Sequence, residues 1–267
     1  MGYPDKSSDS SARVLHWRTG AVAHLRFNRP EALNAIDVAM AQAFLRACTE
    51  IAADPSVRAV RISGEGRAFM AGGDVAAMHA DPVGTPPELI AGVHGGLRLL
   101  AGMDAPVVAE VQGAVAGGGL GLALSCDLVV AAEGTRFAVA YPLIGASCDC
   151  STSWALPRLV GLRKALELAL LGETVDAATA LQLGLVNRVV PPERLAAEVD
   201  GLVERLAAGP TLALGRLKKL LRSSLERDFD AQLDAEASGF LACAGSNDFR
   251  AGVAAFLARS KAQFTGT

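Results

Sequence analysis

The 267-residue sequence is poor in aromatic residues, which make up 5%, and has no excess of basic charge, since its formal net charge is −3. A nucleic-acid-binding surface usually combines a basic patch with aromatic side chains, so this composition argues against such a partner. No apolar run is long enough for a membrane span. Residues 1–12 are polar and serine-rich, without the apolar stretch of a secretory signal. We therefore expect a cytoplasmic protein with no membrane partner and a loose N-terminal arm over residues 1–12.

Cysteine is also scarce: the five cysteines form no C-x-x-C pair. Without an export signal, reduced thiols are favoured over a disulfide framework. Cys148 and Cys150 have no further cysteine or histidine beside them to complete a zinc site, so we expect no metal. The four histidines, which we interpret as surface or packing residues, are scattered along the chain: His16, His24, His79 and His94.

Apolar residues, in contrast, make up 51% of the chain and charged residues only 20%, which is enough to bury one large core. Strand and helix patterns alternate through the first half of the chain, which predicts an α/β fold with right-handed crossovers between parallel strands. From residue 152 onward the pattern is nearly all helical. The expected strands are 14–17, 21–27, 57–63, 107–111 and 127–132, and Thr19-Gly20 predicts that the first two form a hairpin. The expected helices begin at Asp37, near Asp74 and at Pro86 or Pro87.

Two glycine-containing turns carry the candidate chemistry. Gly117, Gly118 and Gly119 stand between an apolar strand pattern and a helical pattern. Backbone N–H groups at such a junction are uncovered and attract a negative charge or a polarised carbonyl oxygen. A similar turn lies upstream at residues 69–74, where Asp74 suits a helix N-terminus. Two such N–H donors would together form an oxyanion hole.

Four segments, in this order, resemble signatures of the enoyl-CoA hydratase/isomerase (crotonase) superfamily. They are NRPEALNA at 28–35, FMAGGD at 69–74, GAVAGGG at 113–119 and ALQLGLVN at 180–187. The resemblance covers roughly residues 13–264, and residues 154–161 look most like the ring-epoxide phenylacetyl-CoA isomerase branch. It implies a crotonase (ClpP-like) spiral of repeated ββα turns over residues 13–195. It also implies a C-terminal helical region, residues 196–267, that forms trimer contacts, often within a dimer of trimers.

The resemblance further implies an acyl-CoA substrate, as in fatty acid metabolism, whose thioester oxygen meets the N–H groups of Gly73 and Gly118. Coenzyme A is part of this substrate, and no separate cofactor is expected. The residues that the resemblance and the pocket pattern place near the substrate are Arg29, Ala32, Leu33, Ala71, Asp74, Val75, Met78, Tyr141 and Lys261. Arg29 could meet a phosphate and Lys261 could reach a neighbouring subunit's ligand, although each could equally be a solvated surface charge.

Hydratases of the superfamily use two glutamates, and this chain has Gly121 and Tyr141 at those positions. Asp149 aligns instead with an acidic position of several double-bond isomerases, and a single carboxylate suits a 1,3-proton shift. The alternative is that Asp149 caps the following helix. In the dehalogenase branch an aspartate at this position is a nucleophile, with an aromatic residue at the position of Tyr141 and a histidine that activates water. Neither His79 nor His94 clearly matches that histidine.

The sequence therefore predicts an enoyl-CoA isomerase with Asp149 as its acid and base. Tyr141 either lines the pocket, donates a hydrogen bond or simply packs. A hydratase with a non-standard site is the alternative of the same class. A CoA-binding homologue that has lost catalysis is the alternative of another class.

Overall fold

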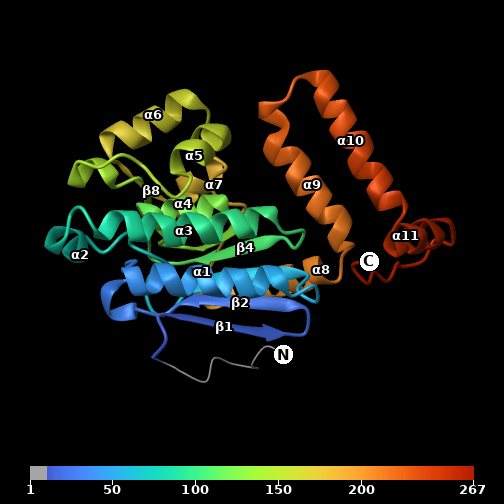
Figure 1. Cartoon of the computed structure of the whole chain (residues 1–267), viewed down its shortest axis with the longest axis horizontal. Coiled ribbons are helices and arrows are strands. Elements are labelled where there is room, and N and C mark those ends of the chain that lie inside the picture. The colour runs from blue at the N-terminus through green and yellow to red at the C-terminus, as the bar shows by residue number, and fades with distance from the viewer. Residues whose placement is uncertain (1–10) are drawn as a thin grey trace.

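The computed structural model describes residues 11–267 and contains a six-stranded sheet in the order β1-β2-β3-β4-β6-β9. Its first two strands, β1 and β2, lie at one edge of the molecule (Figure 1). The predicted hairpin is confirmed: β1 and β2 are antiparallel and joined at Gly20, whose φ is +57°. Every later neighbouring pair is parallel, which requires the crossover connections that the alternating pattern predicted. The strands are β1 (Val14–Thr19), β2 (Val22–Phe27), β3 (Ala59–Gly64), β4 (Val107–Val111), β6 (Leu128–Ala132) and β9 (Arg188–Val190).

A second, three-stranded sheet has the order β5-β7-β8, with β5 parallel to β7 and β7 antiparallel to β8. Its strands are β5 (Ala114–Ala116), β7 (Arg136–Ala138) and β8 (Thr174–Asp176). The nearly all-helical interpretation of the chain after residue 152 was wrong for β8 and β9. Each has only three residues, which is too short for an alternating pattern to be recognised.

Helix α1 (Val38–Ala53) packs closely against helix α3 (Thr85–Gly102). The predicted cap of α1 is confirmed, because the Asp37 side chain accepts a hydrogen bond from the Met40 amide at 2.7 Å. A Cβ on Gly92 would lie 2.8 Å from the Ala41 backbone, and one on Gly96 would overlap the Phe44 ring. These glycines therefore let α3 lie directly on α1, and the face of α3 opposite to them points away from α1.

The C-terminal helices divide into one that covers the main sheet and three that leave it. Helix α8 (Leu195–Ala207) buries Val199 and Val203 together with sheet residues such as Val108. Helices α9 (Thr211–Ser223), α10 (Phe229–Ala244) and α11 (Asn247–Leu257) extend away from the core (Figure 1). Phe229 and Phe256 on these helices are 76% and 83% exposed. The trimer contacts expected of this region stay a prediction.

A buried lysine anchors the extended helices. Lys218 of α9 donates to the carbonyl oxygens of Leu100 at 3.2 Å and Ala105 at 3.0 Å, and to Asp127 Oδ2 at 3.2 Å. Burial lowers the pKa of Lys218 from its ordinary value, while the neighbouring Asp127 charge opposes that shift. Three acceptors compensate for removing this ammonium group from water, so Lys218 anchors α9 to the core.

The remaining helices are short and lie between the strands and longer helices along the chain. They are α2 (Val75–Ala80), α4 (Gly118–Ser125), α5 (Thr152–Val160), α6 (Leu162–Leu171) and α7 (Ala177–Gln182), with the short 3-10 helices η1 (Pro30–Ala32), η2 (Tyr141–Ile144), η3 (Pro192–Arg194) and η4 (Ser224–Glu226). None of the helices in residues 11–267 is long and apolar enough to cross a membrane. Almost all of the predicted N-terminal arm, residues 1–12, lies outside the described residues.

Candidate active site

A large cavity, of about 620 Å³, lies where both glycine turns meet α3 and the segment before α5. It is lined by Gly73 and Gly118 from the turns, by His94 from α3, and by Tyr141 and Asp149 from the last segment. Apolar side chains of α2 and α3 complete its wall. It thus brings backbone donors, a carboxylate and an imidazole together beside an apolar surface, as in many ligand sites.

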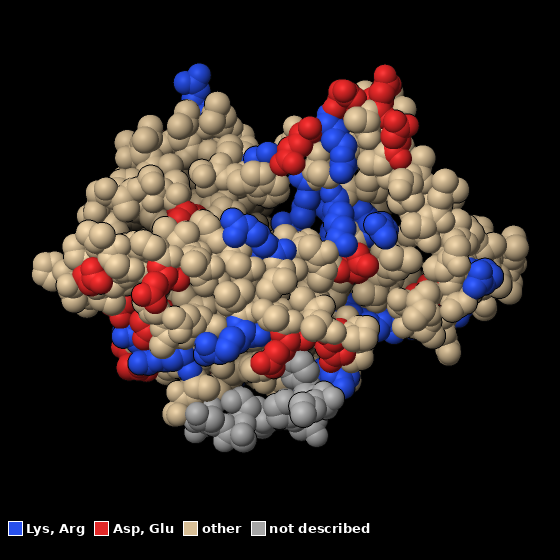
Figure 2. All heavy atoms as spheres, viewed as in Figure 1, with Lys and Arg blue, Asp and Glu red and all other residues tan. Residues whose placement is uncertain are grey.

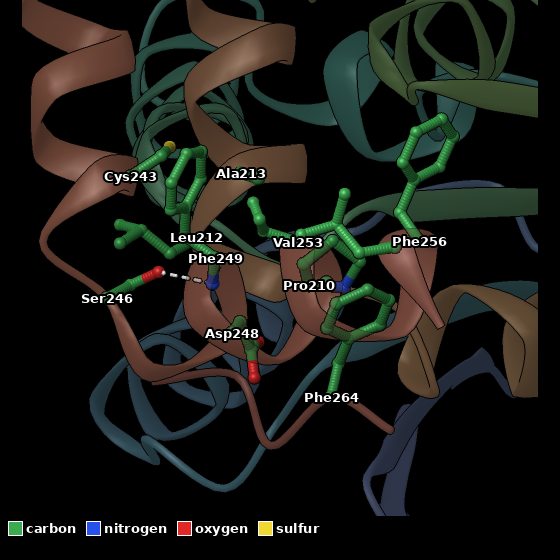
Figure 3. Close-up of a pocket in the computed structure, with 12 residues that line it drawn as sticks. Pro210, Leu212, Ala213, Cys243, Ser246, Asp248, Phe249, Val253, Phe256 and Phe264 are labelled. Carbon is green, nitrogen blue, oxygen red and sulfur yellow. Dashed lines mark hydrogen bonds between the residues drawn. The ribbon is translucent and has the colours of Figure 1, made fainter. Parts of the chain in front are cut away.

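Two other cavities do not combine such groups. The one in Figure 3, about 350 Å³, lies among α9, α10, α11 and the following segment and is lined by Phe249 and Phe264. Its polar groups are already engaged: Ser246 Oγ accepts from the Phe249 amide at 3.0 Å, and Asp248 accepts from the Thr265 amide at 2.6 Å. Apart from the free thiol of Cys243, it therefore offers an apolar surface.

The third cavity, about 580 Å³, lies beside α9, where Figure 2 shows Lys and Arg side chains gathered in a hollow. Lys219 pairs with Asp104 at 2.7 Å, and Arg222 pairs with Asp127 at 2.8 Å. Because these cations already have carboxylate partners, the hollow is less basic than its lysines and arginines alone suggest.

The two glycine turns touch one another at the large cavity. Gly72 and Gly117 have φ of +106° and +51°, conformations that favour glycine. A Cβ on Gly117 would lie 3.6 Å from the Gly72 Cα, so the two backbones approach closely. Isolated bridges from Ile36 to Gly73 and from Met70 to Val115 hold this arrangement.

The backbone amides of Gly73 and Gly118, which lie next to these close backbone contacts, are free hydrogen-bond donors. Within residues 11–267, neither the Gly73 N–H nor the Gly118 N–H donates a hydrogen bond to the protein. Gly118 is the first residue of α4, where an amide has no intrahelical acceptor. Two unpaired N–H groups therefore line one cavity, and one of them lies at a helix N-terminus, where negative charge is favoured.

Asp149 is the carboxylate beside these donors. A Cβ on Gly118 would lie 3.9 Å from Asp149 Oδ1. The Tyr141 hydroxyl donates to the same oxygen at 2.5 Å. Burial, together with the adjacent Asp149 charge, raises the pKa of Tyr141, so this phenol stays protonated and remains a donor. Tyr141 therefore fixes the orientation of the half-buried carboxylate.

The turn that follows Asp149 is strained. Cys150 and Ser151 have φ of +49° and +67°, and two successive non-glycine residues in this region cost about 1–3 kcal/mol each. His94 Nε2 accepts a hydrogen bond from the Cys150 amide at 3.1 Å, and Ser151 Oγ lies 2.5 Å from Ser125 Oγ. Contacts to two other helices thus stabilise the turn.

Ligand atoms of His94, Asp149 and Cys150 lie within 4.8 Å of one another. This spacing resembles that of a metal-ligand set, but the groups are already engaged with the protein. The imidazole accepts from a backbone amide and Asp149 accepts from Tyr141. Burial, and secondarily the Asp149 charge, raise the pKa of the Cys150 thiol, which disfavours the thiolate that a metal would need. The geometry favours a hydrogen-bonded cluster over a metal centre.

Comparison with known proteins identifies the family. The sequence profile described as enoyl-CoA hydratase/isomerase matches residues 18–267. The chain belongs to the enoyl-CoA hydratase/isomerase family. It is 37% identical to a 1,2-epoxyphenylacetyl-CoA isomerase of Escherichia coli K12, over 92% of this chain and 95% of that protein. It is 32% identical to 4-chlorobenzoyl coenzyme A dehalogenase-2 of an Arthrobacter species, over 96% and 93%.

A solved enoyl-CoA hydratase structure from Mycobacterium smegmatis matches with a TM-score of 0.88 and 35% identity, over 94% of this chain and 98% of that one. The predicted crotonase fold is therefore confirmed, and the protein is a crotonase-family enzyme that processes acyl-CoA. Both isomerase and hydratase names occur among the relatives, so the reaction has to be argued from the site.

Five uncharged substrate-binding residues predicted from the family resemblance and the pocket pattern fall into two groups. Ala71, Val75 and Met78 line the large cavity. Ala32 and Leu33 belong to or follow η1, and the Leu33 carbonyl accepts from the Ala71 amide at 3.0 Å. The second group therefore lies next to the first through a direct backbone contact.

The charged residues predicted to contact the substrate, Arg29, Asp74 and Lys261, do not line the large cavity. Arg29 donates to Asp74 Oδ2 at 2.6 Å, and this hydrogen bond lowers the pKa of Asp74. Asp74 also caps α2 by accepting from the Ala77 amide at 3.1 Å. The Arg29 charge is thus balanced within the chain. Lys261 is exposed, follows α11 and is not among the residues that line the cavity. Roles for either residue in phosphate binding stay predictions.

The structure gives a steric reason why position 121, where the family resemblance predicts a glutamate in the hydratases, has no side chain. A Cβ on Gly121 would overlap the Cys150 carbonyl oxygen and lie 2.5 Å from Thr152 Oγ1. The strained turn after Asp149 thus occupies the space that a side chain at this position would need. At the other position, Tyr141 donates to Asp149 instead of supplying a second carboxylate.

We expect Gly121→Ala to lower the free energy of unfolding by about 1–3 kcal/mol, because even a methyl group overlaps backbone here. Thermal denaturation should show the melting temperature falling by about 3–10 °C. The matched control is Gly201→Ala, in the middle of α8, where a Cβ meets nothing within 4 Å. That control should be neutral or slightly stabilising. Equal melting temperatures for the two variants would contradict the proposed overlap.

His94 is the residue of this site that the sequence interpretation missed. It was interpreted as a surface or packing residue, but it lines the cavity and bonds to the residue after Asp149. The sequence did contain a signal for the direction of His94. Gly92 and Gly96 face α1, and His94, two residues from each, therefore lies on the opposite side of α3. The sequence pattern could not show that this side of α3 faces the cavity.

Proposed function

We propose that the protein is an enoyl-CoA double-bond isomerase in which Asp149 moves the proton. The observation that carries this proposal is a single carboxylate, Asp149, beside two unpaired backbone amides in one cavity. The family resemblance adds that Gly121 and Tyr141 stand where the hydratases are expected to have their two glutamates. The relationship to the Escherichia coli 1,2-epoxyphenylacetyl-CoA isomerase supports the same choice.

In this mechanism the thioester oxygen of a 3-enoyl-CoA accepts hydrogen bonds from the Gly73 and Gly118 amides. Asp149 removes a proton from C2, and the electron pair of that C–H bond moves into the enolate, whose charge the two amides stabilise. Asp149 then returns the proton to C4, which shifts the double bond to C2–C3. The carboxylate is regenerated and no water is consumed, so one acid–base group is sufficient.

Tyr141 keeps the carboxylate oriented during this transfer by donating to Asp149 Oδ1. The apolar cavity wall accommodates the acyl group, while the backbone near Ala32, Leu33 and Ala71 supports the coenzyme A part. We further propose a cytoplasmic homotrimer or dimer of trimers, in which Lys261 reaches a neighbouring subunit's ligand. Coenzyme A belongs to the substrate, and the mechanism uses no separate cofactor.

The test is a paired assay that follows the absorbance of the conjugated thioester. We expect absorbance to rise with a 3-enoyl-CoA and to stay constant with a 2-enoyl-CoA, since isomerisation forms the conjugated double bond and water is not added to it. A fall with the 2-enoyl-CoA would indicate hydration and overturn the proposal. Silence with both, across several acyl groups, would favour a CoA-binding protein that has lost catalysis.

One observation favours a second candidate, a hydrolytic dehalogenation of an aromatic acyl-CoA. His94 lies beside Asp149 in the same cavity, and two relatives are 4-chlorobenzoyl coenzyme A dehalogenases. In that reaction the Asp149 carboxylate would attack the halogen-bearing ring carbon and halide would leave. Water would then hydrolyse the aryl ester, and His94 could activate that water only after its Nε2 releases the Cys150 amide. Halide release from 4-chlorobenzoyl-CoA would favour this candidate, whereas isomerisation without halide release would favour the first.

A further inference from the structure

The geometry points to His94 as a positioning residue: through its hydrogen bond to the Cys150 amide, it holds the strained turn that aims Asp149 at the thioester site. This inference rests on the proposed function, because it concerns the catalytic carboxylate. Cys150 and Ser151 adopt φ of +49° and +67°, and such a turn persists only where its surroundings hold it in place.

The contact comes from a rigid part of the protein. His94 lies on α3, which Gly92 and Gly96 allow to pack directly on α1. Its Nε2 accepts from the Cys150 amide at 3.1 Å across 56 residues of sequence. The main-chain carbonyl of Asp149 accepts from the Thr152 amide at 3.0 Å, so both polar groups of the peptide unit that joins Asp149 to Cys150 are held by hydrogen bonds.

Fixing this turn also fixes Asp149 with respect to the donor at Gly118. A Cβ on Gly118 would lie 3.2 Å from Cys150 Sγ and 3.9 Å from Asp149 Oδ1, so both residues pack against the start of α4. If the Cys150 amide lost its acceptor, the turn could relax and carry the carboxylate with it. A displacement of about 1 Å at a reacting group can lower a rate by about a hundredfold.

The direction of the hydrogen bond between Cys150 and His94 distinguishes a positioning role for His94 from an acid–base role. A ring nitrogen that accepts a hydrogen bond carries no proton, so the proton of the neutral imidazole is on Nδ1. The Nε2 lone pair is already used by the Cys150 amide and is not available to a water molecule. His94 therefore acts on the reaction through Cys150 and Asp149.

The test compares two replacements of His94. Glutamine keeps an acceptor at about the reach of Nε2 but cannot titrate, whereas leucine offers no acceptor. We expect His94→Leu to lower kcat for 3-enoyl-CoA isomerisation by about 30- to 100-fold with KM changed less than about threefold. We expect His94→Gln to stay within about fivefold of the wild-type kcat. His79→Leu, at an exposed position on α2 outside the cavity lining, is the matched control.

The outcomes are distinguishable. Equal losses in His94→Gln and His94→Leu would overturn positioning and favour a titrating role. No loss in either would show that the turn does not need the contact. Asp149→Asn, measured in the same series, reports on the proposed function separately: if that variant keeps full activity, the isomerase proposal fails whatever His94 does.

A second measurement does not depend on turnover. In protein labelled with ¹⁵N-histidine, the His94 signals can be assigned by their absence from His94→Gln. We expect the Nδ1-protonated tautomer, with Nε2 as the acceptor. An imidazole protonated at Nε2 would contradict the inferred hydrogen bond and overturn the proposal even if no substrate were known.

Discussion

Asp149→Asn should lower isomerase kcat by about a thousandfold, because the amide cannot take a proton from C2 or return one to C4. The replacement has nearly the same shape, and its side-chain oxygen can still accept from the Tyr141 hydroxyl as Asp149 Oδ1 does at 2.5 Å. The loss should therefore be in kcat, with KM and the melting temperature little changed. Steady-state kinetics with a 3-enoyl-CoA, together with thermal denaturation, measures both.

A matched control is Asp228→Asn, the same change at the exposed cap of α10. Because asparagine caps a helix about as well as aspartate, this variant should keep nearly the same stability and the same kcat as the wild type. If Asp149→Asn were as active as this control, Asp149 would be only a turn residue. The isomerase mechanism would then be wrong.

Gly118→Pro should lower kcat by about 10²- to 10³-fold, because it removes one of the two N–H groups proposed to stabilise the enolate. Backbone donors can rarely be removed by substitution, but Gly118 is the first residue of α4, where proline is tolerated and no intrahelical hydrogen bond is lost. The expected effect is on the transition state, so kcat and kcat/KM should fall together.

Gly118→Ala separates the loss of the amide from the added bulk. It keeps the N–H group, and its Cβ would lie 3.2 Å from Cys150 Sγ, a tight contact that a small side-chain shift can relieve. We expect alanine to lower kcat by less than about tenfold. Equal losses for alanine and proline would mean that crowding against Cys150, rather than the missing donor, causes the defect. In that case the Gly118 amide would not be part of an oxyanion hole.

Much of this protein follows from short-range sequence patterns. Asp37 and Asp74 were predicted as helix caps, and each accepts from an amide three residues later. The hairpin at Gly20 and the helix that begins at Gly118 were predicted from local glycine positions. These features depend on neighbours within a few residues, so the sequence alone is sufficient to indicate them.

The family and fold also followed from sequence, because the glycine motifs occur in one order along the chain. The same motifs indicated that Gly121 and Tyr141 replace the two glutamates expected of the hydratases. Sequence could not show why Gly121 lacks a side chain: the Cys150 carbonyl occupies that space, and the two residues come together only when α4 and the turn before α5 pack.

The arrangement around Asp149 was decided by tertiary structure. Tyr141 had three open interpretations, and packing brought its hydroxyl to within 2.5 Å of the carboxylate. His94 meets the Cys150 amide across 56 residues, and β9 becomes a strand only by pairing with β6. Such contacts join distant segments, and their partners are chosen by how helices and strands pack. The sequence determined which groups are available for chemistry, and the tertiary structure decided which of them meet.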